Sequence, residues 1–195
     1  CFSIYMTRCN GIIIDTNSDN LYTLCLFLKT SEDYKFEQLI DICCVDFYTY
    51  ATSNWSVNSA SDSGFSRGRE EVAITNYPYS VRFVTVYHFL SITNNLRITV
   101  RNFISSENLV VPSLCPLWPS ANWYEREIFD LFGIFFSNHP FLCRILTDYN
   151  FNGFPLRKDF PLIGYKELKY DKSLKKCVYS DVAITQDTVN VKVIR

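Results

Sequence analysis

Two stretches in which apolar and polar side chains alternate constrain the fold of this chain more than any other feature. Between residues 80 and 90, the odd-numbered positions carry the apolar or small side chains Val81, Phe83, Thr85, Tyr87 and Phe89. Leu96–Ile104 alternates in the same way, and the Asn94-Asn95 pair between the two stretches favours a tight turn. A period of two is that of a strand with one buried face. The sequence therefore predicts an antiparallel hairpin whose apolar face other elements must cover.

Two helices are predicted to provide that cover. The first is expected over residues 17–30, where polar residues suited to capping are followed by apolar residues at helical spacing. The capping candidates are Asn17, Ser18 and Asp19, and the apolar residues are Leu21, Leu24, Cys25 and Leu28. The second helix is expected over residues 121–133, with Ser120 as its cap and Gly133 as its stop.

The remaining segments complete an α+β pattern. We expect a short helix over residues 34–38, a buried strand over 39–46, and a surface-loop insertion over the Ser- and Asn-rich residues 51–79. The predicted fold has two layers, with helices packed on one face of a small mixed β-sheet and an extended C-terminal tail. Residues 1–146 would form the core domain and 147–195 an extended partner-binding C-terminal segment.

Composition excludes several classes of function. The net charge is −1, so there is no basic excess for binding nucleic acid. No apolar run reaches the ~18–20 residues of a membrane span, and no glycine-rich motif for nucleotide phosphates occurs. The eight cysteines contain no C-x-x-C pair, so we expect reduced thiols. Aromatic residues make up 16% of the chain and charged residues only 20%, which indicates a surface that associates with partners.

The densest cluster of charges lies in residues 120–146. We interpret it as a structural ionic network, semi-buried between the second helix and the loop after it, with the histidine hydrogen-bonded in a turn. Its members would be Glu125, Arg126, Glu127, Asp130, His139 and Arg144. The alternative is a free-standing ligand- or metal-binding domain that uses Glu127, Asp130 and His139. A bundle metal site of that kind needs matching ligands from a second helix, and the sequence offers none.

A second dense stretch, residues 153–162, places Arg157, Lys158 and Asp159 between two prolines. Proline fixes its own backbone and favours extended geometry in the residue before it. A stiff extended segment is suited to lying along another protein. Binding of an anion by Arg157 and Lys158 is the alternative.

These motifs together resemble a known family. Glu125-Arg-Glu-Ile-Phe-Asp-Leu-Phe-Gly, followed by His139-Pro and Arg144-Ile-Leu, is similar to the signature of the thirty-kilodalton subunit family of respiratory complex I. Residues 146–165 are similar to the family segment just downstream, and residues 39–46 resemble its first strand.

The resemblance implies a core structural subunit of the peripheral arm of a proton-pumping NADH:ubiquinone oxidoreductase. Such a chain would be an obligate hetero-oligomer on the matrix side of the mitochondrial inner membrane, packed against the forty-nine-kilodalton subunit that helps build the quinone site. It would bind no cofactor and no metal, and it would carry no redox centre and no catalytic residues. The expected interface residues are Arg157, Lys158, Asp159, Phe160 and Tyr165. The equivalent subunit of a related hydrogenase or plastid dehydrogenase is a further alternative.

Three departures from the family pattern bear on these expectations. Residues 51–79 form an insertion where the family usually has a short link. Cys143 stands where a basic residue is usual, so we expect a weaker contact at that corner of the ionic network. Residues 181–195 do not follow the family closely.

Overall fold

A mixed five-stranded sheet forms the base of the fold. The computed structural model describes residues 2–6, 11–48, 55–57, 69–71, 81–105 and 107–182. In order across the sheet, the strands are β1 (Ser3–Met6), β2 (Ile12–Asn17), β7 (Leu96–Ile104), β6 (Phe83–Ser91) and β3 (Gln38–Asp46). Strands β2 and β7 are parallel, and the other neighbours are antiparallel.

The predicted hairpin is confirmed at the centre of this sheet. Strands β6 and β7 pair from Phe83 opposite Ile104 to Ser91 opposite Leu96. The turn contains Asn95 with φ of 49°, a left-handed conformation that asparagine tolerates. The odd-numbered side chains of β6 are buried, including Tyr87 at 0% exposure, as the alternation predicts.

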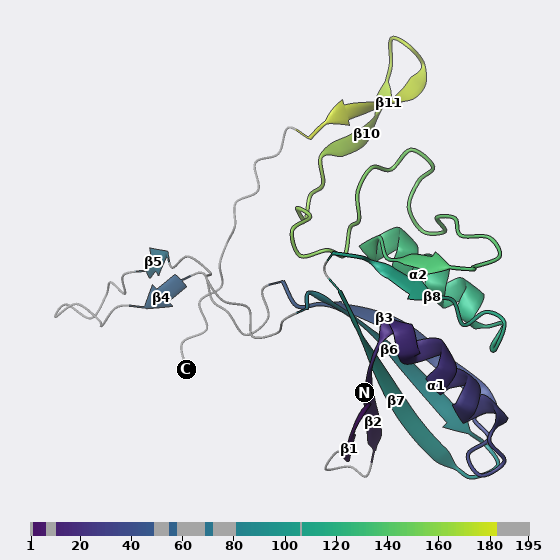
Figure 1. Cartoon of the computed structure of the whole chain (residues 1–195). Coiled ribbons are helices and arrows are strands. Elements are labelled where there is room, and N and C mark those ends of the chain that lie inside the picture. The colour runs from purple at the N-terminus through teal and green to yellow at the C-terminus, as the bar shows by residue number, and fades with distance from the viewer. Residues whose placement is uncertain are drawn as a thin grey trace.

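Two helices supply the second layer, so the predicted two-layer α+β fold is confirmed (Figure 1). Helix α1 (Ser18–Thr30) buries Leu21, Cys25 and Leu28. Asn17 occupies its N-cap position, with extended backbone but without a side-chain capping bond. Helix α2 (Ala121–Phe132) packs on β3, and the Tyr124 hydroxyl donates to the Ile40 carbonyl at 2.8 Å.

The short helix predicted over residues 34–38 is wrong. Residues 32–34 form a turn, Lys35 has φ of 43°, and the chain then extends into β3. The Phe36 amide donates to the Leu28 carbonyl at the end of α1, and the Phe36 side chain is buried. A helix this short does not offset the cost of its first turn, so the burial of Phe36 decides the local conformation.

Two short parallel strands flank α2 and were not predicted. They are β8 (Val110–Pro112) and β9 (Phe135–Ser137). Gly133 ends α2 with φ of 73°, as predicted. Ser120 has helical backbone angles and makes no side-chain capping bond, which differs from its predicted role.

The segments outside the two layers are more regular than the sequence indicates. Strands β10 (Lys166–Asp171) and β11 (Lys176–Asp181) form an antiparallel hairpin in the region predicted as an extended tail. Strands β4 (Trp55–Val57) and β5 (Arg69–Glu71) pair within the predicted 51–79 loop. The rest of that loop and residues 183–195 lie outside the described residues. None of the described helices is long and apolar enough to cross a membrane.

Candidate functional site

Helix α2 presents two fully buried carboxylates, those of Glu125 and Asp130, to two different surroundings. The side chains of both residues are 0% exposed. Five residues along a helix correspond to a rotation of ~140°, so the two groups point in different directions. The structure therefore divides the predicted single ionic network into separate arrangements around each carboxylate.

Asp130 fastens the loop that follows β9 to helix α2. Its Oδ1 accepts from the Arg144 guanidinium at 2.9 Å, and its Oδ2 accepts from the backbone amides of Ile145, Leu146 and Thr147 at 3.1, 2.7 and 2.9 Å. Burial alone would raise the pKa of Asp130. The bonds from Thr147, Leu146 and Arg144 outweigh that effect and lower the pKa to about 2.

Arg144 extends this fastening to the next segment. Besides Asp130, its Nη1 donates to the carbonyl of Gly153 at 3.1 Å. The guanidinium also lies 5.2 Å from the centre of the Phe154 ring. One side chain thus joins α2, its following loop and the start of the 153–162 segment.

Arg126 and Glu127 do not join that arrangement, contrary to the predicted network. Arg126 donates to the carbonyl of Cys143 at 3.3 Å and to its sulfur at 2.9 Å, and it lies over the Trp123 ring. Cys143 stands where the family usually has a basic residue, and the sequence predicts a weaker contact there. In the structure, Cys143 nevertheless receives these contacts from Arg126. Glu127 is exposed.

Glu125 is held by neutral donors. The Ser113 hydroxyl donates to its Oε2 at 2.5 Å, the Leu114 amide to its Oε1 at 2.7 Å, and the Cys115 thiol to its Oε2 at 3.4 Å. Burial raises the pKa of Glu125, because these bonds only partly compensate for the lost water.

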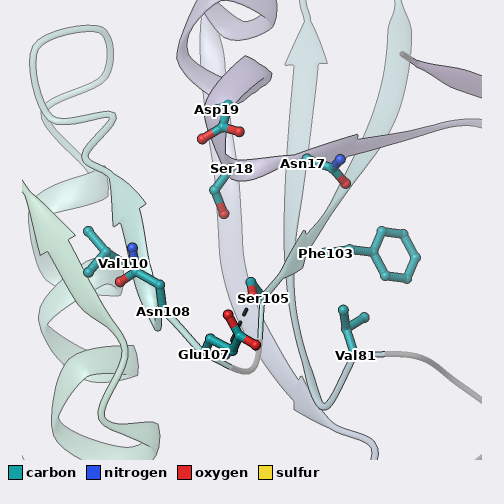
Figure 2. Close-up of a pocket in the computed structure, with 9 residues that line it drawn as sticks. All are labelled: Asn17, Ser18, Asp19, Val81, Phe103, Ser105, Glu107, Asn108 and Val110. Atoms are coloured by element: carbon teal, nitrogen blue, oxygen red, sulfur yellow. Dashed lines mark hydrogen bonds between the residues drawn. The ribbon is translucent and has the colours of Figure 1, made fainter.

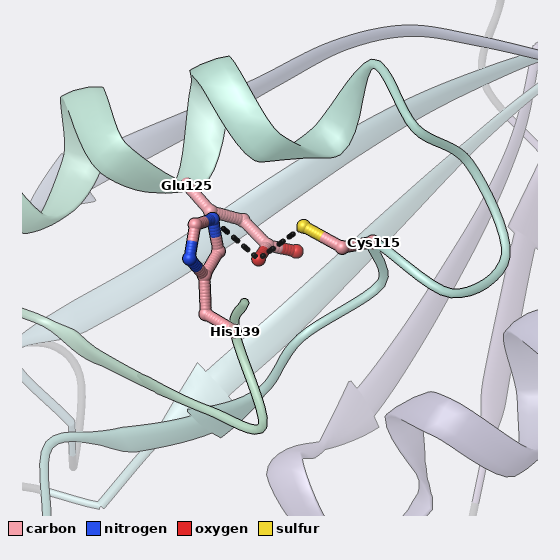
Figure 3. Close-up of side chains that lie close together, drawn as sticks. All are labelled: Cys115, Glu125 and His139. Carbon is pink, nitrogen blue, oxygen red and sulfur yellow. Dashed lines mark hydrogen bonds and ion pairs between the residues drawn. The ribbon is translucent and has the colours of Figure 1, made fainter. Parts of the chain in front are cut away.

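His139 completes this second arrangement, as Figure 3 shows. The Phe141 amide donates to its Nδ1 at 3.1 Å, so the ring proton resides on Nε2, which faces the Asn122 carbonyl at 3.3 Å. Nε2 also lies 3.9 Å from Oε2 of Glu125. Burial lowers the pKa of His139, so the ring is neutral near pH 7. The prediction of a hydrogen-bonded turn histidine agrees with these contacts.

The alternative metal site of Glu127, Asp130 and His139 is not assembled. Glu127 is exposed, and both oxygens of Asp130 accept bonds from other groups. Among the described residues, the cluster with metal-ligating atoms brought together is instead Cys115, Glu125 and His139.

Arg82 and Asp46, which were not among the predicted site residues, join the sheet to the 153–162 segment. Arg82 donates to both oxygens of the buried Asp46, at 3.0 and 2.9 Å, and its Nη2 lies 3.0 Å from Asp159. The Lys158 amide donates to Asp46 at 2.9 Å. Nothing in the sequence marks Arg82 as a site residue except its position in the alternating strand. Asp46 could have been found, because it is an acid at the end of an apolar strand.

Arg157 contacts its own chain at the C-terminal end of α2. Its Nε donates to the Phe132 carbonyl at 2.5 Å, and the guanidinium lies 4.5 Å from the centre of the Phe154 ring. A positive charge at this end of a helix is favourable, because the last carbonyls have no partner within the helix. Burial is the main cause that lowers the pKa of Arg157, and the positive charge of the nearby Arg82 lowers it further.

The other predicted interface residues lie further out on the same segment. The side chain of Lys158 is exposed, and that of Asp159 is 46% exposed. Phe160 is half-buried between Phe151 and the edge of the exposed Tyr165. These rings line a hollow of about 580 Å³ beside β10.

A separate polar hollow of about 600 Å³ lies at the start of α1 (Figure 2). Asn17, Asp19, Glu107 and Asn108 are among the residues that line it. The hydrogen bond drawn there, from the Glu107 amide to Ser105 at 3.4 Å, is a local turn contact. Among the described lining residues, no histidine, cysteine, lysine or arginine accompanies these acids, and we assign the hollow no chemistry.

Comparison with known sequences relates these features to a family. The family model described as respiratory-chain NADH dehydrogenase, 30 Kd subunit, matches residues 14–166. Over 185 residues, the chain is 45% identical to an NADH-quinone oxidoreductase subunit from Legionella pneumophila (strain Corby), covering 94% of this chain and 82% of the relative. It is 46% identical to the corresponding NADH-quinone oxidoreductase subunit from Vesicomyosocius okutanii, with 94% and 88% covered.

Solved structures are similar in fold. The trypsin-resistant fragment (1–134) of Nqo5 matches with a TM-score of 0.55 and 25% identity, over 72% of this chain and 89% of the fragment. A chain of the membrane-bound sulfane sulfur reductase, an archaeal respiratory membrane complex, matches with a TM-score of 0.57 and 19% identity. That match covers 83% of this chain and 78% of the other, and it concerns the fold alone.

Proposed function

The chain belongs to the respiratory-chain NADH dehydrogenase 30 Kd subunit family, and from this premise we propose that it is a scaffold. As a peripheral subunit of NADH-quinone oxidoreductase, it would hold the quinone-reducing module against the forty-nine-kilodalton subunit and contribute no redox centre or catalytic residue of its own. The proposed location is the matrix side of the mitochondrial inner membrane.

The observation that carries the proposal is the contrast between the backbone and the side chains of residues 141–165. The backbone is fastened to the core through Asp130, Asp46 and Arg157. Several large apolar side chains of this segment are nevertheless exposed, with Tyr149 at 100% and Leu162 at 89%. Large apolar groups held rigidly in water are typical of a surface that a partner covers.

The residues predicted at the interface occupy different positions relative to this surface. Phe160 and Tyr165 line the hollow beside β10, where an apolar side chain of a partner would fit. Lys158 and Asp159 would provide a polar rim, as is usual around a buried interface core. Arg157 would act from behind, by holding the segment against α2.

The substitution Leu162→Glu tests the scaffold role, because it places a charge on the exposed surface without removing a core contact. We expect it to reduce the amount of assembled oxidoreductase, measured on native gels, by about tenfold or more, since burying an unpaired charge at an interface is costly. The NADH-to-quinone turnover per assembled complex should stay at the wild-type value.

Ile92→Glu is the matched control. Ile92 is an apolar residue that is 66% exposed, and it lies in the turn of the β6–β7 hairpin, away from the 141–165 segment in sequence. It should leave assembly unchanged. Normal assembly of the Leu162→Glu chain would contradict the proposed surface, and a fall in turnover per assembled complex would contradict a purely structural role.

A further inference from the structure

We propose that Cys115, Glu125 and His139 form a site for a thiophilic divalent cation such as Zn²⁺. The three side chains come from three separate segments: the turn before α2, the helix itself, and the loop after β9 (Figure 3). Their sulfur, oxygen and nitrogen ligand atoms all lie within 4.8 Å of one another. This site is separate from the proposed docking surface and does not depend on it.

The separations of these atoms suit a single small ion. Oε2 of Glu125 lies 3.4 Å from Sγ of Cys115 and 3.9 Å from Nε2 of His139. A tetrahedral zinc ion, with ligands at about 2.0–2.3 Å, holds its ligand atoms about 3.3–3.7 Å apart. Small side-chain rotations therefore bring all three atoms into coordination. A water molecule would complete the fourth position.

The surroundings orient the carboxylate toward this point. The Leu114 amide donates to Oε1, and the Ser113 hydroxyl donates to Oε2. In the orientation that these two bonds fix, Oε2 is the oxygen directed at Cys115 and His139. Hydrogen bonds of this kind commonly fix the ligands of protein metal sites. The side chains of Glu125 and His139 are 0% exposed, whereas Cys115 is half-buried and provides a route for the ion from solvent.

The charges and protons balance on binding. The ion brings two positive charges, which the carboxylate of Glu125 and the thiolate of Cys115 neutralise. The thiol proton of Cys115 is released to solvent. The ring proton of His139 moves from Nε2 to Nδ1, so the Asn122 carbonyl loses its bond from Nε2. Nδ1–H and the Phe141 amide are then both donors, so a rotation of the ring must separate them, and the exposed Phe141 amide bonds to water instead. The described donors to the buried carboxylate of Glu125 are all neutral, so none of them brings a positive charge to it. The cation would supply that positive charge.

Titration with Co²⁺ tests the proposal, because a cobalt–thiolate bond gives a charge-transfer absorption that carboxylate and imidazole ligands alone do not. The chain, purified in reducing buffer with a mild non-ionic detergent and freed of metal, should develop this absorption at one equivalent. Added Zn²⁺ should abolish it by displacing the cobalt. Cys115→Ser keeps a donor toward Glu125, so it preserves the fold and should abolish the absorption. It should also weaken Zn²⁺ binding, measured by calorimetry, by about tenfold or more.

Three of the other thiols supply the controls. Cys177 is an exposed single cysteine, and Cys43 and Cys44 are adjacent and half-buried. Cys177→Ser and the double variant Cys43→Ser/Cys44→Ser should both keep the cobalt absorption. The proposal is overturned if the wild-type chain gives no thiolate absorption, if the absorption survives in Cys115→Ser, or if it disappears only in one of the control variants.

Discussion

At the scale of the residue, Glu125 and Asp130 show how the environment decides what a buried carboxylate does. Both side chains are fully buried on α2. Asp130 receives a guanidinium and three backbone amides and is held ionised, with its pKa lowered to about 2. Glu125 receives neutral donors, and burial raises its pKa. The sequence reveals both acids but not their partners, since those depend on loops whose paths no local pattern defines.

Asp130→Asn tests the structural weight of the first carboxylate. The amide group would turn an N–H toward backbone donors, so we expect the free energy of unfolding at neutral pH to fall by about 2 kcal/mol, measured by urea denaturation. Glu127→Gln, an exposed change on the same helix, should shift it by less than about 0.5 kcal/mol. Equal stability of the two variants would contradict the role assigned to Asp130.

The same carboxylate should give the wild-type chain a characteristic acid sensitivity. The folded-state pKa of Asp130 is about 2, below its ordinary value of 3.8. Its stabilising contribution is therefore complete above pH ~4 and is lost as the pH falls toward 2. The stability difference between the wild-type chain and Asp130→Asn, followed by urea denaturation across this range, should shrink as the pH falls. A difference that stays constant from pH 6 to pH 2 would contradict the lowered pKa.

At the scale of the element, the C-terminal end of α2 is where the helix, the glycine stop and the 153–162 segment meet. Gly133 has φ of 73°, and a Cβ there would lie 2.6 Å from Phe154 and 2.7 Å from Arg157. The helix and its glycine stop were predicted from sequence. The packing of Phe154 and Arg157 over that glycine was not predictable, because it depends on a segment about 20 residues further along the chain.

Gly133→Ala should therefore destabilise the chain more than the left-handed backbone alone explains. Gly164 provides the matched control, since its φ is 77° and a Cβ there would lie 4.0 Å from its nearest neighbour. Gly164→Ala should cost about 1–2 kcal/mol from the backbone alone. Gly133→Ala should cost about 1–3 kcal/mol more, because the added methyl overpacks the contact with Phe154 and Arg157. Urea denaturation of both variants measures the difference, and equal costs would show that the close approach carries no energy.

At the scale of the whole molecule, the sequence predicts the central hairpin, strand β3 and both helices well and the remaining strands poorly. The β6–β7 hairpin and both helices follow from periodicity, because each buries one face along its length, whereas strand β3 follows from an apolar run bounded by acids. Strands β1 and β2, by contrast, were not predicted: β1 lies at the sheet edge with its side chains exposed, and β2 gains its partners β1 and β7 only through tertiary pairing. The β10–β11 hairpin buries neither of its faces in the core. Leu168, Tyr170 and Tyr179 share one face and are exposed, so no buried face marks this pairing in the sequence.

The central claim is that this chain is a subunit of an NADH-quinone oxidoreductase, and its most direct test is to look for the chain in the purified complex. The oxidoreductase should be isolated from the membranes of cells that make the chain and its subunits quantified by mass spectrometry. We expect the chain to co-purify with NADH-to-quinone activity, in a constant ratio to the other subunits across the activity peak. Absence of the chain from the active fractions, or a ratio that varies independently of activity, would contradict the claim.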